Sequence, residues 1–377
     1  MKRIPLIKPD LPPYRSLEKS FSEILENGRI TNFGRYVTRF EEKTTDYMKA
    51  STVTVSSGTQ GLIFALQATG LRPAEKVILP SFSFMATAQA VLYAGGVPLF
   101  AEIEEDLTMS PRDLERLLAR RSDVAVVLPV HTYGLPCRVE EIQRVVEGFR
   151  RKRRRPIHLI YDAAHAFGSS IDGRRVGTFG DAEVFSLSVT KALVSVEGGV
   201  VSSRDERLIR RIKKMRNYGI EENYDAHWPG MNGKMSEFHA IIGLKNLATL
   251  DRNLALRARK ASLYSRRIEE ETIFRTIPSG LRVTHTFKDF TILVPPQLKR
   301  RRDTLIRFLG EQGIETRAYF FPPIHEQKFF RRFANRHLPV TEDLSRRVIT
   351  LPFFTAISEK QIEEVVGALK KAQRRCG

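Results

Sequence analysis

Cysteine is nearly absent from this chain. Only Cys137 and Cys376 occur among 377 residues, and no CxxC or Cys/His spacing surrounds them. The sequence therefore predicts neither a disulfide framework nor a metal site. The chain also lacks an apolar run of about 18 residues, and it begins without the apolar stretch of a signal peptide. These two absences predict a protein that stays in the cytoplasm.

Acidic residues are too few to balance the basic ones. Lysine and arginine number 62 against 43 aspartates and glutamates, which leaves a net charge of +19. Such a charge favours anionic partners, among them phosphorylated metabolites, nucleic acid and acidic lipid. Its sharpest feature is the run RRKRRR at residues 150–155. No aromatic residues interleave with it, so we interpret it as a solvated helix end and loop, and expect neither nucleic-acid nor membrane contact.

The pattern of apolar residues predicts two unequal domains. Residues 1–250 are expected to form a large α/β domain that includes the N-terminal segment, and residues 251–377 a smaller α+β domain. Helical spacing over 111–118 and 139–149 predicts crossover helices, and the helical pattern over 236–268 is expected to bridge the domains. Short strand-like runs alternate with helix-length stretches, which predicts a largely parallel sheet covered on both faces. These runs are VTVSS, KVILP, VAVVLPV, HLIYD, EVFSLS and GGVVSS in the first domain and FKDFTILVP and GIETRAYF in the second.

Two segments place polar residues where parallel sheets bind ligands. In SSGTQGL a strand ends and a helix opens at Gly58 and Thr59. Free amides and the helix dipole there are suited to a phosphate, although a plain N-cap gives the same pattern. In HLIYDAAHAFG, Asp162 stands at the carboxyl end of a strand, and an N-cap or salt bridge is the alternative reading. His165 by itself is more typical of a structural histidine.

A lysine follows the next expected strand. Lys191 lies a few residues after EVFSLS and leads to the pair Gly198 and Gly199. An amine that forms a Schiff base must first lose its proton, which requires a defined and partly desolvated position. Taken alone, a solvated surface lysine is the commoner explanation. The order of the motifs favours the functional explanation for Lys191. A pyridoxal phosphate site needs a phosphate-binding turn, an aromatic segment, an aspartate at a strand end and a lysine, and the chain provides these in order, with PSFSFMAT as the aromatic segment.

The motifs resemble a known family along nearly the whole chain. The segments GRITNFGRYVTRFEE, SSGTQGL, YDAAHAFGS, GMNGKMSEFHAIIGLKNL, GIETRAYFFPPIHEQ and LPVTEDLSRRVITLPFF occur in the order typical of the DegT/DnrJ/EryC1/StrS sugar aminotransferases. The resemblance implies an α/β fold of the type I pyridoxal phosphate transferases. A large domain with a mostly parallel seven-stranded sheet and a smaller C-terminal α+β domain are then expected.

The resemblance also implies which residues act. Lys191 is expected to bind pyridoxal 5'-phosphate covalently and to move a proton between the substrate carbon and the cofactor. Asp162 is expected to pair with the protonated pyridine nitrogen, His165 to lie beside the ring or its phenolic oxygen, and Phe84 to stack on the ring.

The phosphate of the cofactor is expected to bind between two chains. The resemblance assigns it to Gly58, Thr59 and Ser186. Asn232, in GMNGKM, matches a position that reaches the phosphate of the neighbouring subunit, which implies a homodimer with shared active sites.

Substrate detail is less determined. Lys234 stands where an arginine is more usual and Tyr161 where a glutamate is common, close to the expected ring pocket or subunit contact. Some relatives are dehydratases with histidine in place of Lys191, so the lysine favours transamination. The implied reaction moves an amino group from an L-amino acid, glutamate by expectation, to the keto group of a nucleotide-linked deoxysugar. A keto-cyclitol or aminoshikimate-type substrate, or a non-catalytic regulatory relative, is the alternative.

Overall fold

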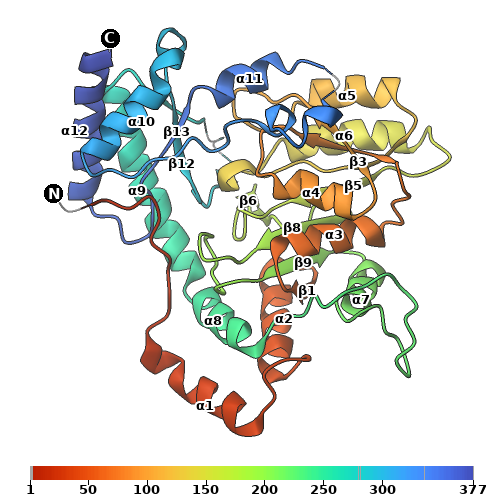
Figure 1. Ribbon diagram of the computed structural model, residues 1–377. Helices are drawn as coiled ribbons and strands as arrows, with labels where there is room; N and C mark the ends of the chain where they lie inside the picture. The colour runs from red at the N-terminus through yellow and green to blue at the C-terminus, as the bar shows by residue number, and fades with distance from the viewer. Residues whose placement is uncertain (1–2, 279, 281, 335, 377) are drawn as a thin grey trace.

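A central sheet lies between two layers of helices, and a smaller sheet packs among the C-terminal helices (Figure 1). The computed structural model describes residues 3–278, 280, 282–334 and 336–376. No helix within these described residues is long and apolar enough to cross a membrane.

The central sheet has seven strands in the order β1-β9-β8-β5-β4-β2-β3. β9 runs antiparallel to both β1 and β8, and the other neighbouring pairs are parallel, which confirms the predicted sheet. β3 is a strand that the expected runs did not include. It contains Pro98, and its place at the sheet edge is where a strand tolerates proline. The strands are β1 (Ser51–Val55), β2 (Lys76–Pro80), β3 (Val97–Ala101), β4 (Val124–Val127), β5 (His158–Asp162), β8 (Ala182–Ser186) and β9 (Gly199–Ser203).

Successive residues of each strand face opposite layers. In β4, for example, Val126 packs into one apolar cluster and Val127 into the other. This alternation explains why the strands read as continuous apolar runs, because both faces are buried. One layer contains α3 (Gly58–Ala68), α4 (Ala86–Tyr93) and α7 (Glu206–Met215). The other contains α2 (Arg35–Met48) and the two predicted crossover helices, α5 (Pro111–Arg120) and α6 (Val139–Arg150).

The helical stretch expected over 236–268 consists of two helices. α8 (Glu237–Leu247) and α9 (Leu250–Glu271) are separated at Thr249, whose φ and ψ are −113° and 0°. The Thr249 hydroxyl donates to the carbonyl oxygen of Asn246 at 3.2 Å, and such side-chain bonds compete with the helical ladder. α1 (Glu18–Asn27) packs beside α8, and α9 runs from there to the C-terminal helices (Figure 1).

The C-terminal part is built on the sheet β10-β12-β13. Tyr264 of α9 stacks on Phe290 of β12 with ring centroids 4.5 Å apart. GIETRAYF forms no strand there, because only Arg317 pairs with the sheet, at Thr350. The elements are β10 (Arg275–Thr276), β12 (Phe290–Leu293), β13 (Val348–Leu351), α10 (Arg302–Glu311), α11 (Pro339–Ser345) and α12 (Glu359–Cys376). A third small sheet joins β6 (Ser170–Ile171), β7 (Arg174–Arg175) and β11 (Val283–Thr284), and 3-10 turns cover Tyr14–Ser16, Thr132–Gly134, Pro296–Arg301, Ile324–Glu326 and Arg331–Phe333.

The N-terminal segment reaches this C-terminal part. Ile4 donates its backbone N–H to the carbonyl oxygen of Gly313 at 2.9 Å and is buried in the same apolar cluster as Tyr264. The first residues thus pack on the part of the chain that comes last. The division at residues 250 and 251 stays a prediction.

The basic run is only partly a solvated loop. It joins α6 to the amino end of β5, away from the end that bears Asp162. The guanidinium groups of Arg150, Arg153 and Arg155 donate to main-chain carbonyl oxygens of neighbouring segments at 2.8, 2.6 and 2.6 Å. The expectation of full solvation is therefore wrong for these three, because they tie adjacent loops together. The other three cations of the run are exposed.

Candidate active site

A cavity of about 270 Å³ opens at the carboxyl ends of β5 and β8, beside the start of α3. Seven of the predicted site residues line it, namely Gly58, Thr59, Phe84, Asp162, His165, Ser186 and Lys191. Larger hollows exist elsewhere, including one of about 690 Å³ beside α1 and α2 and one of about 620 Å³ beside α9. Neither contains a predicted site residue. The residues for which the sequence predicts a chemical role therefore lie together around the smaller cavity.

The start of α3 and the end of β8 form one cradle. Ser57 caps the helix by accepting the Gln60 N–H at 3.1 Å. The N–H groups of Gly58 and Thr59 lie in the first turn, where no carbonyl four residues earlier can accept them. A Cβ on Gly58 would lie 2.8 Å from the Cβ of Ser186, so only glycine allows β8 so close to the helix. Free amides, a positive helix end and a hydroxyl together suit a phosphate group.

Asp162 is a buried carboxylate held in a fixed orientation. The Thr87 hydroxyl donates to its Oδ2 at 2.7 Å, and the Ala164 N–H donates to its Oδ1 at 3.1 Å. Ser83 in turn contacts the Thr87 hydroxyl at 2.8 Å and must donate to it, since the Thr87 proton points to the carboxylate. Burial raises the pKa of Asp162, and the two hydrogen bonds oppose that rise. Such a carboxylate is suited to a cationic partner that enters the cavity.

Lys191 has the altered proton affinity that a reactive amine needs. Its pKa is lowered from 10.5 to about 8, first by burial and then by the positive charge of Lys288. Asp289, Asp162 and Glu197 act in the opposite direction. At pH 8 about half of such an amine is neutral, against about 0.3% of an ordinary lysine. The amine can therefore act as a nucleophile and a base near neutral pH.

Aromatic groups and an unpaired ring nitrogen complete the wall. Phe84 is 52% exposed, so its face is open toward the cavity that it lines. The His165 ring stacks on Phe320 with centroids 6.2 Å apart, and burial lowers its pKa, which keeps the ring neutral. Its Nδ1 is buried and has no hydrogen-bond partner among the described residues. A buried polar atom without a partner costs about 1–3 kcal/mol, so a ligand that bonds to it would be stabilised.

Asn232 does not join this cavity in its own chain. Its side chain is exposed, and its backbone pairs with Asn217. The neighbouring Lys234 donates to the Asn217 side-chain oxygen at 3.3 Å and lies 5.1 Å from the Tyr218 ring centroid. The role predicted for Asn232 in a neighbouring subunit stays a prediction.

Sequence reasoning missed several residues that shape the site. Thr87 holds the carboxylate, Phe320 packs on His165, and Lys288 lowers the pKa of Lys191. The one sequence signal that could have identified Thr87 was its position at the end of the aromatic segment PSFSFMAT. Both Phe320 and Lys288 come from the C-terminal part. Phe320 lies in GIETRAYFFPPIHEQ, a segment of the family resemblance to which no site residue was assigned, and nothing in the sequence marks Lys288 as a neighbour of the cavity.

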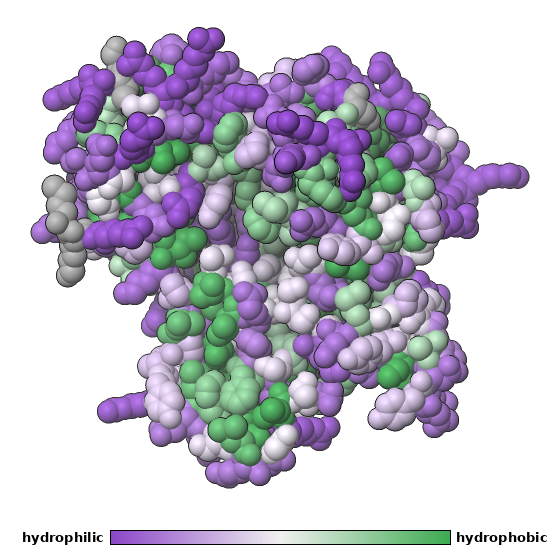
Figure 2. Space-filling model, viewed as in Figure 1, coloured by the Kyte–Doolittle hydropathy of each residue, from purple (hydrophilic) through white to green (hydrophobic). Residues whose placement is uncertain are grey.

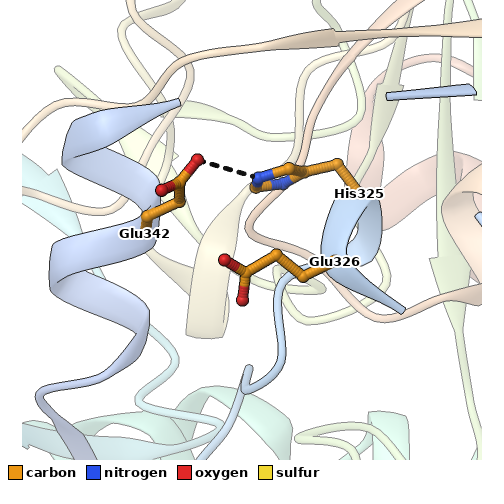
Figure 3. A group of neighbouring side chains, drawn as sticks. All are labelled: His325, Glu326 and Glu342. Atoms are coloured by element: carbon orange, nitrogen blue, oxygen red, sulfur yellow. Dashed lines mark hydrogen bonds and ion pairs between the residues drawn. The ribbon is translucent and has the colours of Figure 1, made fainter. Parts of the chain in front are cut away.

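A histidine and two glutamates gather outside the cavity (Figure 3). The ligand atoms of His325, Glu326 and Glu342 lie within 4.8 Å of one another. Each already has a protein partner: His325 Nδ1 is 2.6 Å from the Ser81 hydroxyl, its Nε2 is 3.3 Å from Glu342, and Arg346 donates to Glu326 at 2.6 Å. These contacts fasten the segment before α11 to the end of β2, which is a structural role.

Known proteins share this architecture over the full chain. The model of the DegT/DnrJ/EryC1/StrS aminotransferase family matches residues 15–370. A dTDP-4-amino-4,6-dideoxy-D-glucose transaminase of Escherichia coli is 30% identical over 98% of both chains. A UDP-N-acetyl-3-dehydro-alpha-D-glucosamine 3-aminotransferase of Acidithiobacillus ferrooxidans is 32% identical over 84% of this chain and 82% of its own. The crystal structure of DesI with its TDP-sugar product superposes with a TM-score of 0.91 at 29% identity, covering 100% of this chain and 94% of that one. The chain therefore belongs to the DegT/DnrJ/EryC1/StrS aminotransferase family and is a pyridoxal phosphate-dependent sugar aminotransferase.

Proposed function

We propose that this enzyme transfers an amino group from L-glutamate to the keto group of a nucleotide-linked deoxysugar. The observation that supports the proposal is that Lys191, Asp162 and the start of α3 line the same cavity of about 270 Å³. The relatives named above act on sugars linked to dTDP or UDP, which supports the substrate class. The net charge of +19 is favourable for a diphosphate substrate.

The residues of the cavity fit the cofactor. Gly58, Thr59 and Ser186 would hold its phosphate, Phe84 would cover one face of its ring, and the unpaired nitrogen of His165 would bond to a polar atom of the ring. When bound, pyridoxal phosphate supplies an electron sink for the charge that develops at the substrate carbon.

Asp162 and Lys191 would have different roles in acid–base catalysis. The Asp162 carboxylate would keep the ring nitrogen protonated, and its own burial strengthens that interaction, because few other groups screen it. Lys191 would take a proton from the substrate carbon in one half-reaction and return a proton in the other. Its pKa of about 8 places both protonation states within reach near neutral pH.

The most direct test combines one substitution with a substrate panel. The wild-type protein is mixed with glutamate and a set of nucleotide keto-sugars, with a keto-inositol for the alternative substrate class, and the aminated product is identified by mass. Lys191→Ala should abolish turnover and the absorbance of the lysine-bound cofactor, while the cofactor still binds through its phosphate and ring contacts. Normal turnover by this variant, or amination of the keto-inositol alone, would overturn the proposal.

We further propose a homodimer in which Asn232 of one chain completes the phosphate site of the other. The support is the exposure of Asn232 and a region of apolar side chains around α1 and α8 (Figure 2), where Leu25 is 64% and Ile30 is 44% exposed. A two-fold contact would place two such loops at once, one in each site.

Mixed dimers test the shared site. Asn232→Asp should repel the phosphate, and Lys191→Ala should inactivate the site of its own chain. A dimer of one chain of each variant carries both defects in one site and leaves the other intact. Subunit exchange between the two inactive proteins should restore up to about half of the wild-type activity per mixed dimer. No recovery despite demonstrated exchange, or a fully active monomer in light scattering, would refute the shared site.

A further inference from the structure

Glu197 lines the active-site cavity without a part in holding the cofactor. It is one of four ionisable residues in the described wall, and the other three, Asp162, His165 and Lys191, have roles toward the cofactor. Its side chain is exposed, and its carboxylate makes no hydrogen bond or ion pair with any residue that the structure describes. Only its main-chain carbonyl oxygen has a partner there, the Ser195 hydroxyl at 2.9 Å. The carboxylate is thus available to accept hydrogen bonds from a substrate.

The backbone next to Glu197 is strained and firmly held. Val196 has a φ of 70°, a left-handed conformation that a β-branched residue rarely adopts. The Ser195 N–H donates to the carbonyl oxygen of Leu187 at 2.8 Å, and the Leu187 N–H donates to the carbonyl oxygen of Gly198 at 2.9 Å. Strained backbone that its surroundings hold in place is concentrated at functional sites. These bonds fix the position from which the Glu197 side chain reaches the cavity.

Of the two substrates, the sugar is the one that can use this carboxylate. The reacting carbon of an amino acid bears a carboxylate group, which a second carboxylate would repel. The keto carbon of a sugar is flanked by a hydroxyl group, which donates a strong hydrogen bond to a charged acceptor. Glu197 and Lys191 line the same cavity of about 270 Å³, so a group that Glu197 binds lies close to the carbon on which Lys191 acts.

We propose that Glu197 is a specificity-determining residue, whose carboxylate accepts a hydrogen bond from the hydroxyl group next to the keto carbon and so orients the sugar for amination. The inference rests on the function proposed above. It assigns to Glu197 a contact with the sugar and none with glutamate, so the two halves of the reaction should depend on this residue differently.

Measuring the two half-reactions separately tests the contact. The loaded enzyme is mixed with L-glutamate, and the enzyme that glutamate has converted is mixed with a dTDP-linked 4-keto-6-deoxyglucose and then with the other keto-sugars of the panel. Glu197→Ala should lower the second-order rate constant of the sugar half-reaction about tenfold or more, as expected for loss of a hydrogen bond to a charged group. Glu197→Gln keeps a neutral acceptor, so its loss should be smaller. The glutamate half-reaction should stay within about twofold of wild type in both variants.

A substrate analogue and a matched variant separate this hydrogen bond from other effects. A keto-sugar that lacks the hydroxyl group next to the keto carbon should react about tenfold more slowly than its parent with the wild-type enzyme. With Glu197→Ala the two sugars should react at similar rates, because that variant has no contact left to lose. Glu364→Ala removes an exposed glutamate on α12, outside the cavity, and should leave both half-reactions unchanged.

Three results would overturn the proposal. These are an equal loss in both half-reactions, an unchanged sugar half-reaction in Glu197→Ala whose fold is retained in circular dichroism, and an analogue that slows Glu197→Ala as much as the wild type. A wild-type enzyme that aminates only the keto-inositol contradicts the proposed function instead. The same comparison is then made on that substrate, because its keto carbon is also flanked by hydroxyl groups.

Discussion

The hydrogen bond from Thr87 to Asp162 should control how tightly the cofactor binds. Thr87→Val keeps the branched shape and removes the hydroxyl, which leaves the buried carboxylate with the Ala164 N–H at 3.1 Å as its remaining hydrogen-bond donor from the protein. Burial already raises the pKa of Asp162, and loss of a donor to the charged form raises it further. A protonated Asp162 no longer favours a cationic pyridine ring.

The geometry of the bond sets the size of the effect. A distance of 2.7 Å between hydroxyl and carboxylate oxygen is that of a charge-assisted hydrogen bond. Such a bond contributes about 1.5–3 kcal/mol, which corresponds to roughly a 10- to 150-fold change in an equilibrium constant. We expect the dissociation constant of pyridoxal phosphate to rise by about tenfold or more, as measured by absorbance titration of the cofactor-free variant.

A serine variant provides the control. Thr87→Ser keeps the hydroxyl and loses only a methyl group, so its cofactor affinity should stay close to that of the wild type. Circular dichroism and thermal unfolding of both variants show whether the fold is retained. Wild-type affinity in the folded valine variant would refute the reasoning, since it would mean that Asp162 keeps its charge, or serves the ring, without Thr87.

Three further results are expected. Asp162→Asn should reduce turnover far more than stability in denaturant titrations, because an amide fills the same space but cannot hold the ring nitrogen protonated; a rate within a few-fold of wild type would contradict this. Replacing Arg151, Lys152 and Arg154 by glutamine should leave turnover unchanged, whereas Arg153→Gln should lower the unfolding temperature, because Arg153 bonds to the carbonyl oxygen of Leu118. Lys191→Met should stabilise the cofactor-free protein at pH 7 by at most about 3 kcal/mol. The folded pKa of about 8 lies below the unfolded value of 10.5, so the wild-type protein loses stability as the pH falls from 10.5 to 8, and the two proteins should unfold alike near pH 10.5.

Much of the sheet, and the grouping of seven predicted residues around the candidate cavity, could be predicted from local sequence signals. Strands buried on both faces read as apolar runs, and Asp162 marks the carboxyl end of one of them. Glycine next to a helix start indicated the cradle, and the structure adds the reason, since a Cβ at Gly58 would collide with Ser186. These signals are local because each depends on a few consecutive residues and on the direction of one strand.

The errors arose where a local pattern was compatible with two structures. The stretch 236–268 keeps helical spacing through Thr249, yet the structure breaks the helix there, with non-helical backbone angles at Thr249 and a bond from its hydroxyl to Asn246. The run 150–155 reads as uniformly charged, yet Arg150, Arg153 and Arg155 donate to carbonyl oxygens of other segments. Whether an arginine is solvated depends on unpaired carbonyl oxygens nearby, and those are set by tertiary packing that sequence spacing does not encode.

The position of Lys288 shows why sequence motifs could not predict the proton affinity of the Lys191 amine. Lys288 lies in the C-terminal part of the chain, whereas every predicted site residue comes from the N-terminal 232 residues. A lysine beside an aspartate in a sequence normally indicates a solvated surface pair. Here the bonds from Thr286 to His165 and from Lys288 to Tyr133 fasten the segment that carries this pair to the N-terminal part of the chain. The packing of the C-terminal part on the rest of the chain, which no local motif records, is therefore what brings the charge of Lys288 close enough to lower the pKa of Lys191.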